Sequence, residues 1–242
     1  MIERLQAFLR TTAAPGREVL SVPPFTAYLD RRDPLRFLNY AIPDGDLEPD
    51  ADAIEELRGA FRRRGRLPRL EWIEEAAPRV APVLAACGLV EELRSPLMAC
   101  TPDGLVDAPV AFDDLRVGVV SDGDVRESDA VQRSAFGLSP APEAEPHRRR
   151  VLARVRGEPA AAAAWSPVAD GVSEIVGVAT AEGWRGRGLG GAVTAAAARA
   201  AFEAGASLCV LSPGDAVAQR VYVRAGFSRV ATMLHWSDPP DS

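Results

Sequence analysis

Residues 173–191 read SEIVGVATAEGWRGRGLGG, and this stretch is the most informative about the fold of the second half of the chain. The run Ser173–Thr180 is rich in β-branched residues and predicts a strand. Glycines crowd the turn that follows, at Gly186, Gly188, Gly190 and Gly191. They let the backbone approach a bulky anion, and a helix expected over 189–204 directs its positive end at the same place. The stretch therefore predicts a binding site for a diphosphate.

Two arginines add fixed positive charge to this turn. Arg185 and Arg187 each carry a planar guanidinium group that can bind phosphate through two parallel hydrogen bonds. Taken alone, the turn also fits an ordinary surface loop that is rich in glycine and arginine. A Rossmann dinucleotide site is less consistent, because Gly186, Gly188 and Gly190 do not have the G-x-G-x-x-G spacing and the turn follows several expected hairpin strands.

The elements around the turn predict an α/β protein with a mixed (α+β) sheet. Hairpin strands come first and helical crossovers follow, which differs from a doubly wound sheet. The alanine run at 160–164 favours a helix by propensity, but it lies between two turn signals, so we expect a strand there. Strands are expected at 115–120, 149–156, 160–168, 173–180, 207–211 and 227–236, and helices at 127–136, 189–204 and 215–224. A loop is expected over 140–146.

Three features together resemble the GNAT superfamily of acyl-CoA-dependent N-acyltransferases. Residues 185–190, RGRGLG, fit the R-x-x-G-x-G signature of that family. Val178 and Thr180 precede it, where the family has the strand whose backbone meets the acetyl thioester. Residues 222–227, YVRAGF, resemble the Y-x-x-x-G-F end of a family helix. The resemblance covers about residues 112–238 and implies a GNAT-type fold with an N-terminal accessory domain.

The resemblance also implies an activity and a set of ligand-binding residues. We expect an N-acetyltransferase that transfers an acetyl or other acyl group from acetyl-CoA to a primary amine by direct attack in a ternary complex. The amide N–H of Val178 is the expected oxyanion donor. Acetyl-CoA is expected to bind along the fourth and fifth strands of the family's sheet, which splay apart. The expected cofactor-binding residues are Val178, Thr180, Arg185, Gly186, Arg187, Gly188, Leu189, Gly190 and Gly191.

Two residues are expected to be catalytic. Tyr222 matches the family tyrosine that protonates the departing CoA sulfur, although a helix tyrosine can equally be a core residue. Glu174 has a placement similar to the glutamate base of the histone-acetyltransferase branch. A period of two places Glu174 on the face of the strand that also holds Val178 and Thr180. A solvent-exposed role for this glutamate, with a chain of waters as the base, stays open.

Other reactive residue types have structural explanations. Asp215 stands where many relatives have asparagine, and we expect it to cap a helix rather than bind the ligand. Cys209 is expected to pack in the core, since direct attack needs no covalent intermediate. His147 and His235 are expected to be structural or solvent-facing, and no metal site is expected.

The first half has weaker signals. We expect an accessory domain over residues 1–108 and the acetyltransferase domain over 109–242, with a linker at 101–112. Short helices and loops are expected in the first fifty residues, followed by a helix that Asp50 caps. Residues 84–89, LAACGL, echo residues 222–227, so this half is either a degenerate GNAT-like unit without the tyrosine or an unrelated strand–helix–strand.

Composition narrows the classes of function. The 242 residues are 47% hydrophobic and 26% charged, as in globular proteins, and no apolar run approaches the length of a membrane span. Arginine is the only basic side chain other than histidine, which excludes lysine Schiff-base chemistry and Walker-type phosphate binding. The net charge of −6 disfavours nucleic acid, and three scattered cysteines favour a reducing cytoplasm.

The expected partner is a small-molecule or peptide amine, with neither a nucleic acid nor a membrane involved, and a homodimer is compatible with the sequence. A non-catalytic acyl-CoA-binding regulatory domain is the alternative function. The retained Tyr222 and Glu174 favour the enzyme.

Overall fold

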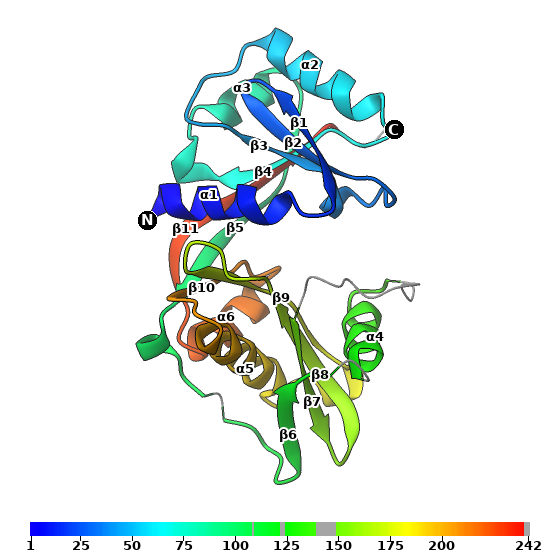
Figure 1. The fold of residues 1–242 in the computed structure, drawn as a ribbon, viewed down its shortest axis with the longest axis vertical. Helices are drawn as coiled ribbons and strands as arrows, with labels where there is room; N and C mark the ends of the chain where they lie inside the picture. The colour runs from blue at the N-terminus through cyan, green and yellow to red at the C-terminus, as the bar shows by residue number, and fades with distance from the viewer. Residues whose placement is uncertain (108, 122–123, 139–148, 240–242) are drawn as a thin grey trace. The chain divides into compact units, whose positions relative to one another are not determined.

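The computed structural model describes residues 1–107, 109–121, 124–138 and 149–239 (Figure 1). The loop expected at 140–146 and His147 lie outside these residues. The chain forms two compact units, one of Met1–Leu97 with Val230–Ser242 and one of Met98–Arg229. Their bounds differ from the expected division after residue 108, because the last strand groups with the first unit.

The first unit is a mixed sheet with helices. Its strands lie in the order β1, β2, β3, β4, β11, β5, and β3 and β4 are parallel because helix α2 connects them as a crossover. The elements are α1 (Ile2–Ala13), β1 (Arg17–Val22), β2 (Phe25–Asp30), η1 (Arg36–Leu38), β3 (Tyr40–Pro43), α2 (Ala51–Arg62), β4 (Arg69–Ile73), η2 (Glu74–Ala76), α3 (Val80–Ala86), β5 (Val90–Cys100) and β11 (Ser228–Ser237).

The expectation of only short helices and loops in the first fifty residues is wrong. That region holds a 12-residue helix and three strands, which pair antiparallel from β1 to β3. Strand β1 is largely accessible to solvent, so its sequence lacks the continuous apolar run of a central strand. The Asp50 cap is confirmed, since its carboxylate accepts a hydrogen bond of 2.8 Å from the Ala53 N–H.

The second unit places helices on both faces of its sheet. Helix α5 packs on β7, β8 and β9 from one side, and α4 packs on the same strands from the other (Figure 1). The alanine run lies in strand β8, as expected. Its elements are η3 (Pro102–Gly104), β6 (Leu115–Val119), α4 (Val125–Ala135), β7 (Arg149–Val155), β8 (Glu158–Trp165), β9 (Val172–Thr180), η5 (Glu182–Trp184), α5 (Leu189–Glu203), β10 (Leu208–Leu211) and α6 (Ala216–Arg224).

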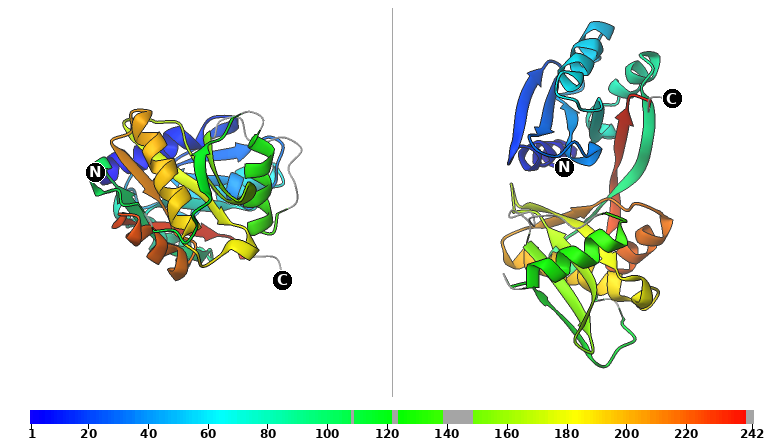
Figure 2. Two further views of the ribbon diagram at one scale, coloured as in Figure 1. Left: turned by 90° about the horizontal axis from the view of Figure 1, so that it is seen from below. Right: turned by 90° about the vertical axis from the view of Figure 1, so that its right-hand side faces the viewer.

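The two units repeat one order of elements, and the last strand of each repeat also pairs with a strand of the other repeat. Strand–helix–strand–helix–strand occurs as β3–α2–β4–α3–β5 and again as β9–α5–β10–α6–β11. Strand β4 pairs antiparallel with β11, whereas β10 pairs with the end of β5, at Met98–Cys100. In the first unit the long strands β5 and β11 lie side by side (Figure 2). The sheet of the first unit thus includes β11 from the second half of the sequence, and that of the second unit includes only the end of β5 from the first half.

The echo between residues 84–89 and 222–227 has a structural basis. Gly88 and Gly226 both follow a helix with positive φ, 81° and 96°. In each case the next N–H reaches back to a helix carbonyl at 3.0 Å, from Leu89 to Leu84 and from Phe227 to Tyr222. This is the same Schellman-type helix end, and leucine stands in the first unit where the second has tyrosine.

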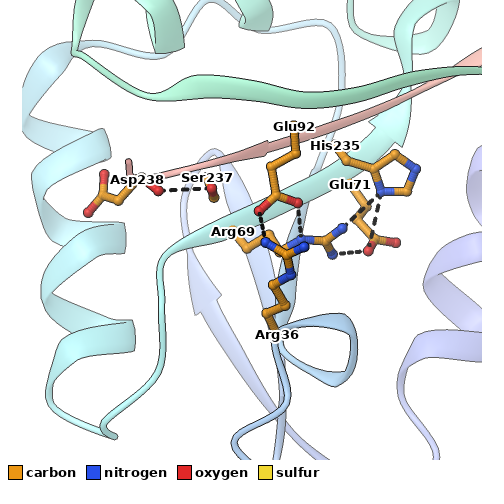
Figure 3. Close-up of polar contacts among 7 residues, drawn as sticks. All are labelled: Arg36, Arg69, Glu71, Glu92, His235, Ser237 and Asp238. Atoms are coloured by element: carbon orange, nitrogen blue, oxygen red, sulfur yellow. Dashed lines mark hydrogen bonds and ion pairs between the residues drawn. The ribbon is translucent and has the colours of Figure 1, made fainter. Parts of the chain in front are cut away.

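A buried charge cluster joins β4, β5 and β11 in the first unit (Figure 3). Arg69, which is 2% exposed, donates to Glu92 at 2.8 Å and also to Glu71. Burial raises the pKa of Glu71, but a hydrogen bond from His235 and the charge of Arg69 outweigh it and lower that pKa to about 2. His235 therefore has a structural role, as expected. Among the described helices, none combines the length and apolar character needed to cross a bilayer.

Replacing Asp238, which directly follows β11, is expected to lower the free energy of unfolding. Its carboxylate accepts hydrogen bonds from Arg58 at 2.8 Å and Arg62 at 2.9 Å, and the Arg58 and Asp238 side chains are only 12% and 9% exposed. Replacing Asp238 by alanine leaves a nearly buried arginine without that carboxylate, so we expect urea unfolding to show a loss of about 2–3 kcal/mol.

The exposed pair of Asp107 and Arg199 provides the matched control. Its side chains are 78% and 48% exposed, so Asp107→Ala should cost less than about 0.5 kcal/mol. Equal losses for the two variants would show that Asp238 does not hold the last strand in place.

Candidate functional site

The glycine-rich turn is open to solvent and leads directly into a long helix. Residues 185–188 are exposed, and Gly188 is the N-terminal cap of the 15-residue helix α5. Its φ of +87° is a conformation that suits glycine. No side chain of the described residues caps this helix, and the first helical hydrogen bond runs from Ala192 to Gly188. The N–H groups of the first turn therefore have no partner within the helix.

Neighbouring segments hold the turn in place from behind. A side chain at position 188 would overlap the Pro109 carbonyl oxygen, so this glycine is needed for close backbone approach. Arg185 donates to the Thr180 carbonyl at 3.2 Å, and the Arg187 guanidinium lies over the rings of Phe112 and Trp184 at 5.6 and 5.7 Å. The two arginines thus stabilise the turn as well as add charge.

The parallel strands β9 and β10 part beside the turn. Their pairing covers only Val172–Glu174 of β9, and the register ends at Val210 opposite Glu174. On its other edge, β9 stays paired with β8 as far as Thr180 opposite Ala161. Within the described residues, the stretch 175–180 therefore has no strand pairing on the β10 side, which leaves backbone groups available to a ligand.

A β-bulge at Gly177 changes which β9 side chains share a face. Ala162 pairs with Ala179 and Ala164 with Val176, so three steps on β9 oppose two on β8. Val178 packs against the core on the α5 side, whereas Ala179 belongs to the cluster beneath α4. The expectation that Glu174 shares a face with Val178 and Thr180 is wrong. A shared face requires an unbroken period of two along β9, and the bulge interrupts that period.

Tyr222 lies on α6 in the core cluster that also receives Val178. Its side chain is mostly buried, with 8% exposed, and its ring centroid lies 6.5 Å from that of Phe227. Burial, and secondarily the charge of Asp215, raise the pKa of Tyr222 to about 12. The hydroxyl therefore keeps its proton across the physiological range, as a general acid requires.

Glu174 lies at the last rung between β9 and β10, where the two strands begin to part. It is half-buried. Since Val176 pairs with Ala164, on the α4 face, Glu174 lies on that face too. The structure thus places Glu174 and Tyr222 on opposite sides of the sheet, with Glu174 at the gap between β9 and β10 and Tyr222 in the core on the α5 side.

The other reactive residues have structural roles, as expected. Cys209 is fully buried, and burial, followed by the charge of Cys100, raises the pKa of Cys209 to about 12, so it is a poor nucleophile. Asp215 caps α6 by accepting a hydrogen bond of 2.7 Å from the Ala218 N–H.

Sequence reasoning missed Gln132, on α4, which donates a hydrogen bond of 2.7 Å to the Gly177 carbonyl oxygen. A glycine inside a β-branched strand is a known sign of a bulge and could have revealed Gly177. Nothing in the sequence identified its partner. The loop between β3 and α2 occupies the position of the glycine-rich turn in the first unit, but its residues 44–50, DGDLEPD, offer carboxylates instead.

Comparisons with known proteins agree with this geometry. The model of the acetyltransferase (GNAT) family matches residues 121–227. A solved GCN5-related N-acetyltransferase from Kribbella flavida is 33% identical, with a TM-score of 0.87, and the match covers 100% of this chain and 96% of that one. The comparison with curated proteins found no match.

Two more distant structures show the same fold. A tandem GNAT protein from the clavulanic acid biosynthesis pathway is 14% identical, with a TM-score of 0.62, over 96% of this chain and 86% of its own. A GCN5-related N-acetyltransferase from Sphaerobacter thermophilus is 15% identical, with a TM-score of 0.66, over 90% and 78%. These matches include the first half of the chain, which is GNAT-like as well. The protein therefore belongs to the GNAT family of acetyltransferases, and acyl transfer is the activity that this membership supports.

Proposed function

We propose that the protein is an N-acetyltransferase that moves the acetyl group of acetyl-CoA to a primary amine by direct attack in a ternary complex. The observation that supports this most strongly is the exposed Gly188 turn, with its helix N-terminus beside the parting strands β9 and β10. Family membership supports acyl transfer. The glycine-rich turn and the gap between β9 and β10 are suited to bind an acyl carrier that bears phosphate groups.

The residues at the turn fit a diphosphate. Uncapped N–H groups at the start of α5 act as donors, and the positive end of the helix dipole favours an anion. In this proposal, Arg185, Gly186, Arg187, Gly188, Leu189, Gly190 and Gly191 bind the pyrophosphate. Val178 and Thr180, on β9, bind the arm that leads into the gap.

In this proposal, residues on the two sides of the gap between β9 and β10 carry out different steps of the acyl transfer. The Val178 N–H donates to the thioester carbonyl oxygen as negative charge develops there. The Tyr222 hydroxyl gives a proton to the departing sulfur, and the high pKa of Tyr222 keeps that proton available. Cys209 takes no part, so no acyl-enzyme forms.

Glu174 is our proposed base for the attacking amine. Its position on the α4 face implies that the amine approaches from the side opposite α5 and α6. Glu174→Gln should lower kcat about 100-fold near neutral pH, because the amide cannot take a proton. Exposed Glu158→Gln is the control and should match the wild type. An unchanged kcat in Glu174→Gln would assign proton removal to water instead.

The function is tested by measuring CoA release from acetyl-CoA with a panel of primary amines, beside calorimetric titration of acetyl-CoA. We expect saturable binding and amine-dependent CoA release. Binding without release across amines, amino acids and peptide N-termini would favour a regulatory acyl-CoA-binding domain. Absence of binding would contradict both functions.

A further inference from the structure

Helix α4 directs one buried polar side chain at the bulge in β9. The buried face of this helix holds Ser128, Val131 and Gln132. Gln132 is 9% exposed, and its side-chain nitrogen lies 2.7 Å from the Gly177 carbonyl oxygen. Because a carbonyl oxygen only accepts hydrogen bonds, the group facing it must be the NH₂ end of the glutamine amide.

Gly177 makes this contact possible in two ways. Its φ of +61° lies in the left-handed region. A Cβ atom at position 177 would come within 2.5 Å of the Gln132 nitrogen, so a side chain there would displace the glutamine. Position 177 thus combines the backbone conformation of the bulge with the space for Gln132.

The hydrogen bond fixes the orientation of one peptide group. The Gly177 carbonyl and the Val178 N–H belong to the same planar trans peptide and point in opposite directions. Since the carbonyl points to Gln132 on α4, the Val178 N–H points away from α4. Val178 packs against the core cluster that contains Tyr222, on the α5 side. Gln132 therefore determines to which side of the sheet the Val178 N–H is presented.

The hydrogen bond from Gln132 to the Gly177 carbonyl oxygen also makes the Val178 N–H a stronger donor. A hydrogen bond to a peptide oxygen polarises the whole peptide group, so its N–H becomes a better donor. We propose that Gln132 is a positioning residue for acyl transfer, which holds the Gly177–Val178 peptide so that the Val178 N–H stabilises the carbonyl oxygen of the thioester. This inference rests on the proposed function and deepens it. The alternative is that Gln132 only satisfies a buried carbonyl exposed by the bulge.

The test uses Gln132→Leu, which keeps similar bulk and removes the donor. In the ligand-free full-length protein, the amide ¹⁵N and ¹H resonances of Val178 should shift. With acetyl-CoA carrying ¹³C at the carbonyl, the infrared carbonyl band of the bound form should move to higher wavenumber than in the wild type. The kcat should fall roughly tenfold to a hundredfold, with KM for acetyl-CoA nearly unchanged.

Two further variants separate positioning from folding. Ser128→Ala changes the same face of α4, one turn away from Gln132. The buried Ser128 hydroxyl has no hydrogen-bond partner among the described residues. The Val178 amide resonances, the infrared carbonyl band and kcat of this variant should therefore match those of the wild type. Gln132→Glu can donate only when protonated, so its kcat relative to the wild type should rise as pH falls through the carboxyl pKa. A purely structural glutamine would not produce that recovery.

The outcomes distinguish this inference from the proposed function. If wild-type protein binds and turns over acetyl-CoA while Gln132→Leu keeps the wild-type band position and kcat, the inference is overturned and the function stands. If the wild type does not bind acetyl-CoA, the proposed function fails and the inference with it. A shifted band, reduced kcat and low-pH recovery in Gln132→Glu would together establish the positioning role.

Discussion

Replacing Gly188 by valine is expected to weaken acetyl-CoA binding at least about 100-fold. A β-branched residue does not adopt the φ of +87° found at this position, and its Cβ would overlap the Pro109 carbonyl oxygen. The turn must therefore rearrange, and its N–H groups no longer converge on one anion. Each charge-assisted hydrogen bond contributes about 1.5–3 kcal/mol, so losing two accounts for the expected drop in affinity. Calorimetric titration measures it.

Two neighbouring glycines are controls for this variant. Gly183 has ordinary φ and open space, so Gly183→Ala should keep wild-type affinity. Gly186 has a φ of +75° but no close neighbour, so Gly186→Ala should lose affinity only by about tenfold, from backbone strain alone. Full affinity in folded Gly188→Val would show that the turn does not bind the phosphates.

Tyr222→Phe is expected to lower kcat about 100-fold while the dissociation constant of acetyl-CoA stays nearly the same. The variant keeps the aromatic ring in the core and removes only the hydroxyl group, whose proton the leaving sulfur needs. In the wild type, burial and the Asp215 charge raise the pKa of Tyr222 to about 12. Loss of activity through ionisation of this tyrosine should therefore occur only near pH 12. Steady-state kinetics across pH test both expectations.

A second buried tyrosine provides the comparison. Tyr28 lies in the first unit, is 4% exposed and also has a pKa raised mainly by burial. Tyr28→Phe removes a hydroxyl from a similar environment and should leave kcat unchanged. If Tyr222→Phe retained the wild-type kcat, another group would have to supply the proton.

Local patterns predicted much of the second unit. The alanine run in β8, the glycine turn before α5 and the Asp215 cap on α6 are each determined by residues within a few positions. The resemblance to the GNAT family rested on such short stretches, and the family is confirmed. The roles given to individual site residues stay predictions.

Features that depend on distant contacts could not be predicted. The pairing of β11 with β4, and of the end of β5 with β10, joins residues more than a hundred positions apart, and a single sequence does not reveal which strands pair. The contact of Gln132 with Gly177 joins a helix and a strand 45 residues apart. The bulge itself placed Glu174 on the α4 face, against the expected period of two.

Amide resonances of the glycine-rich turn offer the most direct measurement of the central claim. The ¹⁵N-labelled protein would be titrated with acetyl-CoA and, separately, with S-acetylpantetheine, which has the same thioester but no phosphates. If the turn binds the pyrophosphate, acetyl-CoA should strongly shift the amide resonances of residues 186–190. S-acetylpantetheine should bind far more weakly and should not shift these resonances. Saturation with acetyl-CoA that left these amides unmoved, or equal affinity for the two compounds, would contradict the account.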